Sequence, residues 1–201
     1  MGKSEYNWAP GETPPLINDH SLAKHEVLDR YLRTYVEVLT TRPVIDKFRL
    51  TLVDGFAGGG CYTTERGGLH LGSPLQMIHA IRDAEAAANA ARNKNFAIEA
   101  DFFFIEKRRQ NIEVLEATLR IDPTAIAYEK QGRIHVLRGS FEDRVAEIVA
   151  QVETKGRAGR AIFLLDQYGY TNVPLATLRD IMARLPRAEF LLTFATDWLI
   201  D

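Results

Sequence analysis

Residues 50–60 have the sequence LTLVDGFAGGG, and this stretch decides the fold. The apolar run Leu50–Val53 is typical of a strand that is buried on both faces of a parallel sheet. Asp54 follows at the carboxyl end of that strand, and the glycines at 58–60 permit a turn whose backbone lies close to a ligand. Because open α/β sheets bind ligands at the carboxyl ends of their strands, we expect residues 54–60 to bind a small molecule.

Four further apolar runs predict the remaining strands, at 102–105, 133–137, 161–165 and 189–194. Apolar residues at helical spacing predict helices at about 19–41, 74–92, 108–120, 141–153 and 174–184. This alternation predicts an α/β fold with a doubly wound, mainly parallel sheet and helices on both faces. Acids end three of the strands, so Asp54, Glu106 and Asp166 are expected at one edge of the sheet.

Two segments lie outside this alternation of strands and helices. Residues 1–18 contain three prolines, and we expect an extended arm that Trp8 holds against an α/β domain at 19–201. Residues 61–72 form a polar loop of unusual length, which is either a functional lid or a surface insertion. After it, Ser73 is predicted to cap the next helix, with Pro74 at its first position.

Composition excludes several classes of protein. Hydrophobic residues make up 46% of the 201 residues and charged residues 26%, as in ordinary globular domains. The net charge of −2 gives no global attraction to nucleic acid, and the single cysteine, Cys61, excludes an intrachain disulfide or a multi-cysteine metal site. No segment resembles a signal peptide or a membrane span, so a cytoplasmic location is expected and no metal site is predicted.

The spacing Asp-x-Phe-x-Gly-x-Gly resembles motif I of the Rossmann-fold, S-adenosylmethionine-dependent methyltransferases, above all those that methylate amino groups or bases. Together with Gly-Ser-Pro at 72–74, it resembles the three-Cys-motif partner protein family, a methyltransferase-like group. The resemblance begins near residue 19 and covers only the N-terminal part of a typical member. It implies that the sheet lacks the last helix and hairpin, and thus the C-terminal strands, of a complete methyltransferase fold.

The predicted cofactor is S-adenosylmethionine. Glu106, at the end of the second strand, is placed to accept hydrogen bonds from its ribose hydroxyls. The resemblance implies contacts from the glycine turn and from the end of the third strand, where related enzymes use an acid to bind the adenine amino group and this chain has serine. The candidate cofactor-binding residues are Asp54, Phe56, Ala57, Gly58, Gly60, Glu106, Ser140 and Phe141.

The fourth strand ends in Asp-Gln-Tyr-Gly, at 166–169. In methyltransferases that act on amino groups of nucleic acids, the matching loop has Asp or Asn, then two prolines and an aromatic residue. The resemblance therefore implies that Asp166 accepts a hydrogen bond from the target amine and that Tyr168 stacks on a flipped base. A cytosine-C5 enzyme is disfavoured, because Cys61 does not lie in this loop.

Several alternatives stay open. The departures at Ser140 and in the 166–169 loop also favour a non-catalytic partner that docks a three-Cys-motif protein. The cations at 20–25 and the basic residues at 155–160 either serve a ligand or nucleic acid, or are solvated surface. A nucleotide-dependent oxidoreductase is disfavoured, because the Gly-x-Gly-x-x-Gly fingerprint is missing.

Overall fold

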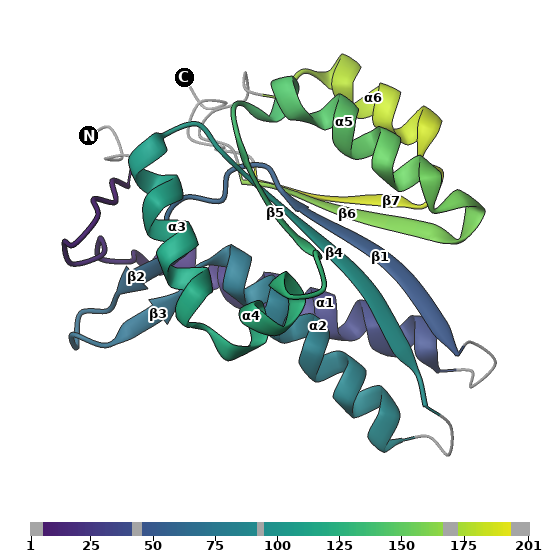
Figure 1. Ribbon diagram of the computed structural model, residues 1–201, viewed down its shortest axis with the longest axis horizontal. Helices are drawn as coiled ribbons and strands as arrows, with labels where there is room; N and C mark the ends of the chain where they lie inside the picture. The colour runs from purple at the N-terminus through teal and green to yellow at the C-terminus, as the bar shows by residue number, and fades with distance from the viewer. Residues whose placement is uncertain (1–5, 42–45, 92–94, 167–172, 194–201) are drawn as a thin grey trace.

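The computed structural model describes residues 6–41, 46–91, 95–166 and 173–193, without the Arg157 side chain. Its centre is a sheet of five parallel strands in the order β5-β4-β1-β6-β7 (Figure 1). The strands are β1 (Lys47–Asp54), β4 (Ala97–Glu106), β5 (Ile134–Arg138), β6 (Gly159–Leu165) and β7 (Ala188–Leu192). This arrangement confirms the predicted doubly wound α/β fold.

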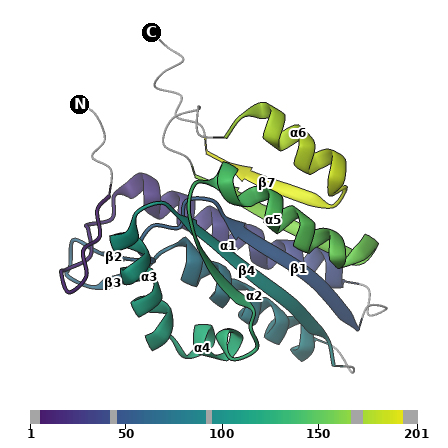
Figure 2. The ribbon, with the colours of Figure 1, turned by 45° about the horizontal axis from the view of Figure 1, so that its top comes forward.

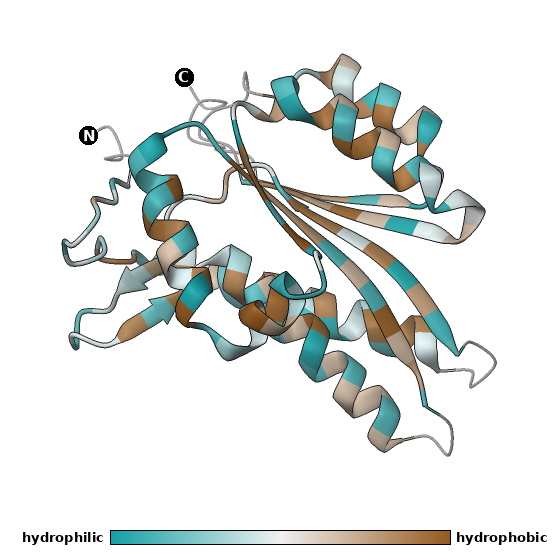
Figure 3. Ribbon diagram, viewed as in Figure 1, coloured by the Kyte–Doolittle hydropathy of each residue, from teal (hydrophilic) through white to brown (hydrophobic). Residues whose placement is uncertain are grey.

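The helices cover both faces of this sheet, as Figures 1 and 2 show. One core cluster joins apolar residues of α1, α2, α3 and α4 to one face, and a second joins those of α5 and α6 to the other. Figure 3 shows the hydrophobic residues along the strands between these two layers. The helices are α1 (Asp19–Thr40), α2 (Ser73–Ala90), α3 (Arg109–Ile121), α4 (Pro123–Glu129), α5 (Phe141–Thr154) and α6 (Leu175–Arg184), with a 3-10 turn, η1, at Gly156–Ala158.

Residues 61–72 are not an irregular loop. They form an antiparallel hairpin of β2 (Cys61–Thr63) and β3 (Leu69–Leu71). The N-terminal arm packs along it, because the Ile17 amide donates to the Thr63 carbonyl and the Thr63 amide donates to the Pro15 carbonyl, both at 2.9 Å. Each strand has only three residues, too few for periodicity to reveal.

Strand β4 begins at Ala97, five residues before the predicted apolar run at 102–105. Its first half carries Glu99 and Asp101, and these charged residues interrupt the apolar pattern from which a buried strand is predicted. In the structure, these acids are paired with cations from neighbouring elements. Lys47 and Arg49 contact Glu99 at 2.8 and 3.1 Å.

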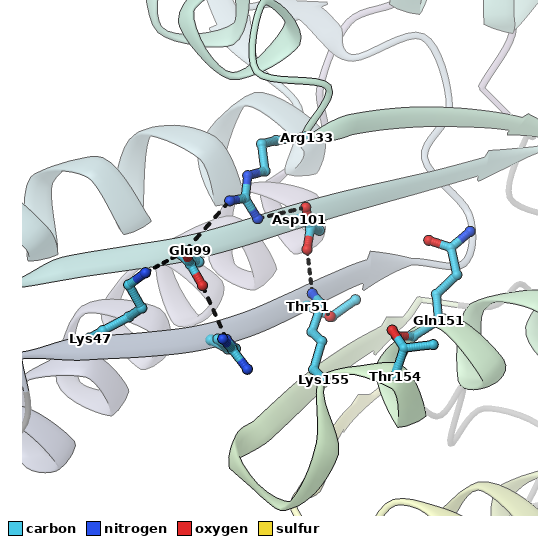
Figure 4. A network of polar contacts seen from close by, with 9 residues as sticks. Lys47, Thr51, Glu99, Asp101, Arg133, Gln151, Thr154 and Lys155 are labelled. Carbon is cyan, nitrogen blue, oxygen red and sulfur yellow. Dashed lines mark hydrogen bonds and ion pairs between the residues drawn. The ribbon is translucent and has the colours of Figure 1, made fainter.

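Lys155, the first residue of the basic segment at 155–160, belongs to the same network of ion pairs (Figure 4). Lys155 caps the C-terminus of α5, and its ammonium group donates to Thr51 Oγ1 at 2.6 Å and forms an ion pair with Asp101. Arg133 contacts the other oxygen of Asp101 at 3.2 Å. Only 16% of the Lys155 side chain is exposed, so this lysine stabilises the sheet and is not part of a basic surface.

Among the residues that the structure describes, no helix combines the length and the apolar character that crossing a membrane requires.

Candidate functional site

A cavity of about 910 Å³ lies at the carboxyl edge of the parallel sheet. Its walls come from the glycine turn after β1, the ends of β4, β6 and β7, the start of α1 and the N-terminal arm. Six of the predicted site residues line it: Phe56, Gly58, Glu106, Ser140, Phe141 and Asp166. Asp54, Ala57 and Gly60 do not line the cavity, and Tyr168 lies outside the described residues.

The glycine turn is held between the two strands that flank β1. The Gly55 amide donates to the Leu164 carbonyl and the Ala57 amide donates to the Ile105 carbonyl, both at 2.9 Å. Gly58 and Gly60 have φ angles of +61° and +78°, which residues with a side chain rarely adopt. The turn therefore needs glycine at both positions, and its backbone forms the floor of the cavity.

Asp54 stabilises this turn by hydrogen bonding, without lining the cavity. Its carboxylate is 1% exposed and accepts hydrogen bonds from the Phe56 amide at 3.0 Å and from the Ser73 hydroxyl at 2.6 Å. Burial raises the pKa of Asp54 to about 6, although both hydrogen bonds lower it. The predicted cap at Ser73 is wrong, because Gly72 occupies the N-cap position of α2 and the Ser73 side chain is bound to Asp54.

Glu106 is the acid that faces the cavity at the end of β4. Its carboxylate accepts one hydrogen bond from the Gly58 amide at 3.1 Å and one from the Arg108 amide at 2.8 Å. A carboxylate has about four acceptor positions, so two remain for a ligand. A hydrogen bond therefore joins Glu106 to the glycine turn, which is possible because β4 lies beside β1 in the sheet.

The start of α5, after β5, contributes its N-cap Ser140 and its first residue Phe141. The Ser140 hydroxyl is committed to a capping box at the start of α5: it bonds to the Asp143 carboxylate at 2.5 Å and accepts from the Asp143 amide at 3.2 Å. Phe141 is 1% exposed and packs edge-on against Phe163, so it is both a core residue and part of the cavity wall. Glu142, the acid that follows Phe141, does not line the cavity.

Asp166, directly after β6, forms an ion pair with Lys24 of α1 across the cavity mouth. Lys24 Nζ donates to Asp166 Oδ1 at 2.6 Å, and the two side chains are 40% and 37% exposed. Lys24, one of the cations at 20–25, therefore lines the cavity and is paired with Asp166, whereas its role toward a ligand stays a prediction. The pair brings together residues that are 142 positions apart.

His25, the neighbour of Lys24, faces a second histidine. Its Nδ1 lies 2.9 Å from Nε2 of His70 in β3, and the Gln76 amide lies 3.2 Å from the same His70 nitrogen. Burial, with smaller contributions from nearby charges, lowers the pKa of His25 to about 4, so this residue is neutral at pH 7. Within the described part of the chain no three His, Cys, Asp or Glu side chains form a metal-binding group.

The N-terminal arm closes one side of the cavity. Trp8 is 5% exposed, donates from its indole nitrogen to the Cys61 carbonyl at 2.6 Å, and lies against the faces of Gly58 and Gly59. Tyr6 and Tyr62 complete an aromatic cluster with ring centres 5.0–5.8 Å apart. The prediction that Trp8 holds the arm is confirmed, but sequence reasoning gave no hint that it does so on the glycine turn.

Asn111 is among the cavity-lining residues that sequence reasoning did not single out. Asn111, in the first turn of α3, is 3% exposed and lines the cavity. Its Oδ1 atom has no hydrogen-bond partner among the described residues. The only sequence signal was an asparagine five positions after Glu106 on a predicted helix.

No protein-family model matches the chain, and no curated protein matches it significantly.

Proposed function

We propose that this chain is an S-adenosylmethionine-dependent methyltransferase that transfers a methyl group to an amino group of a nucleic acid in the cytoplasm. The observation that carries the proposal is the position of Glu106. Its carboxylate is anchored to the Gly58 amide and faces a cavity at the carboxyl edge of a doubly wound sheet. In such folds, an acid at this strand end binds the ribose of a nucleotide cofactor.

The residues present fit this cofactor. A cavity of about 910 Å³ matches the size of small-molecule sites, which span roughly 300–1,000 Å³. The glycine turn has no side chains to obstruct a ligand, Glu106 offers acceptors to ribose hydroxyls, and Phe56 offers apolar surface to an adenine ring.

S-adenosylmethionine supplies an electrophilic methyl group on a sulfonium centre. Asp166 accepts a hydrogen bond from the target amine, which directs the nitrogen lone pair toward that methyl group and contributes to the rate by positioning. Lys24, 2.6 Å from Asp166, holds the orientation of that carboxylate. Tyr168 is proposed to stack on the base that carries the amine.

The charges around the cavity support an anionic substrate. Lys24, Lys107 and Arg108 line it, together with the acids Glu106 and Asp166. Cations grouped at the mouth of a site attract phosphate groups even where the net charge of the protein is close to zero. Nucleic acid therefore remains the substrate class that we favour.

A second function follows from the same ion pair. An aspartate already bound to a lysine is less available to an amine, so the chain is alternatively a non-catalytic protein that binds S-adenosylmethionine and docks a three-Cys-motif partner. The two functions differ in turnover, not in cofactor binding.

Methyl transfer from tritium-labelled S-adenosylmethionine to single-stranded DNA and RNA tests the proposal. We expect labelled nucleic acid with the unmodified chain and at least a hundredfold loss with Asp166→Ala. Asp180→Ala is the matched control, because Asp180 is an exposed aspartate of α6 outside the cavity lining. Cofactor binding without any transfer would favour the docking function, and equal transfer by both variants would remove Asp166 from the reaction.

A further inference from the structure

We propose that Asn111 is a ligand-binding residue whose side-chain amide hydrogen-bonds to a ribose hydroxyl of the nucleoside in the cavity. Nothing in the sequence motifs assigns this residue a role. The inference rests on the proposed function for the identity of the ligand, but its evidence is separate from the evidence for Glu106.

The first observation is an unpaired polar atom. Asn111 is 97% buried, at 3% exposure, and its Oδ1 has no hydrogen-bond partner among the residues that the structure describes. Buried polar side chains are nearly always paired, so an exception needs a function or an unseen partner. The described part of the chain has two other such atoms, Tyr35 Oη and Gln76 Oε1, and neither residue lines the cavity at the sheet edge.

The second observation is the position of Asn111. It lies in the first turn of α3, directly after the β4 end that carries Glu106, and both residues line the same cavity. This part of the cavity wall therefore combines the acceptor atoms of Glu106 with the donor and acceptor atoms of the Asn111 amide.

Hydroxyl groups suit such a mixed set. A hydroxyl both donates and accepts, so it pairs with the Asn111 amide in either of the amide's two flipped orientations. A ribose carries two neighbouring hydroxyls, which allows one to bind Glu106 and the other Asn111. A buried water at Asn111 is the competing explanation, and it predicts that the residue contributes nothing to ligand affinity.

Binding of S-adenosylhomocysteine and its 2′-deoxy and 3′-deoxy analogues to three forms of the protein separates these explanations. The forms are the unmodified chain, Asn111→Leu and Asn111→Ala, which is smaller and tests whether Leu merely overpacks the site. Thr118→Val is the matched control, because it removes a buried polar group of the same helix that is already paired, with Val114 and Cys61.

We expect both Asn111 variants to bind S-adenosylhomocysteine about tenfold more weakly, a difference of ~1.4 kcal/mol. One of the two deoxy analogues should bind the unmodified chain about tenfold more weakly than S-adenosylhomocysteine does. The Asn111 variants should not weaken the binding of this analogue further, because the hydroxyl that Asn111 contacts is already missing from it. Without ligand, Asn111→Leu should melt at the same or a higher temperature, because it removes an unpaired buried group, whereas Thr118→Val should melt lower with unchanged affinity.

Two results overturn the inference. If the unmodified chain binds S-adenosylhomocysteine and both Asn111 variants bind it equally well, or lose affinity equally for all three ligands, Asn111 makes no hydroxyl contact while the proposed function stands. If the unmodified, folded chain binds none of the three nucleosides, the inference and the proposed function both fail.

Discussion

Replacing Gly59 by alanine should detach the N-terminal arm. A Cβ at Gly59 would lie 2.3 Å from Cγ and 2.4 Å from Cδ1 of Trp8, whereas non-bonded carbon atoms approach to about 3.5 Å. The indole must therefore move by more than ~1 Å, which removes its hydrogen bond to the Cys61 carbonyl and exposes a side chain that is now 5% exposed. Truncating a buried tryptophan costs ~3–5 kcal/mol, so we expect Gly59→Ala to cost about 3 kcal/mol.

A double-mutant cycle in urea measures this coupling. Trp8→Ala should cost about 4 kcal/mol, and adding Gly59→Ala to it should cost less than ~0.5 kcal/mol, because the obstacle is gone. Gly68→Ala is the control: its Cβ would meet only Thr64 Oγ1, at 3.3 Å, and it should cost less than ~1 kcal/mol. Equal costs for Gly59→Ala with and without Trp8 would refute the reasoning, as would a cost for Gly59→Ala no larger than that for Gly68→Ala.

Three further predictions concern charged groups. The raised pKa of Asp54, from 3.8 to about 6, means that the folded state holds a proton that the unfolded chain has lost between these values, so stability falls as pH rises through this range. Between pH 4 and pH 7 this group should lower the free energy of unfolding by about 2 kcal/mol, and denaturation at the two pH values should show that Asp54→Asn abolishes this loss; an unchanged pH dependence in the variant would contradict it. Lys155→Met should lower the free energy of unfolding by about 2 kcal/mol, because it leaves the largely buried carboxylate of Asp101 without this partner; a loss below ~0.5 kcal/mol would show that the ion pair contributes as little as a solvent-exposed one. Lys24→Met should change the free energy of unfolding by less than ~1 kcal/mol, because the pair with Asp166 is well exposed, yet slow methyl transfer; unaltered transfer would exclude a role in positioning.

Much of the fold could be predicted from the sequence, because the central strands are nearly uninterrupted apolar runs. Because both faces of the parallel sheet are buried, Thr51 is the only polar residue within Leu50–Val53, and residues 161–165 contain none. The convergence of Glu106 and Asp166 on one cavity followed from the same logic, since parallel strands end at the same edge.

The parts of the fold that could not be predicted depend on contacts between distant parts of the chain. The first half of β4 was missed because Glu99 and Asp101 are polar, and only the folded chain supplies their partners. The pairing of Lys24 with Asp166 joins α1 to β6, and no local pattern encodes it.

The candidate site, too, could be predicted from the sequence only in part. Motif spacing identified Asp54 but did not distinguish a residue that touches a ligand from one that supports the turn. That distinction comes from the hydrogen bond with Ser73, which depends on how α2 packs against β1. Asn111 had no signal at all, because an unpaired amide is a property of the folded environment.

Calorimetric titration with S-adenosylmethionine tests the central claim most directly. Gly58→Val is a poor probe of the cavity, because its Cβ would lie 2.7 Å from Trp8 and its φ of +61° disfavours valine, so it perturbs the arm as well. Glu106→Gln is sharper, with Glu113→Gln, an exposed residue of α3 outside the cavity lining, as its matched control.

We predict micromolar binding by the unmodified chain and by Glu113→Gln, and at least tenfold weaker binding by Glu106→Gln. Absence of binding by the folded, unmodified chain would contradict the account, and so would equal affinity in all three proteins.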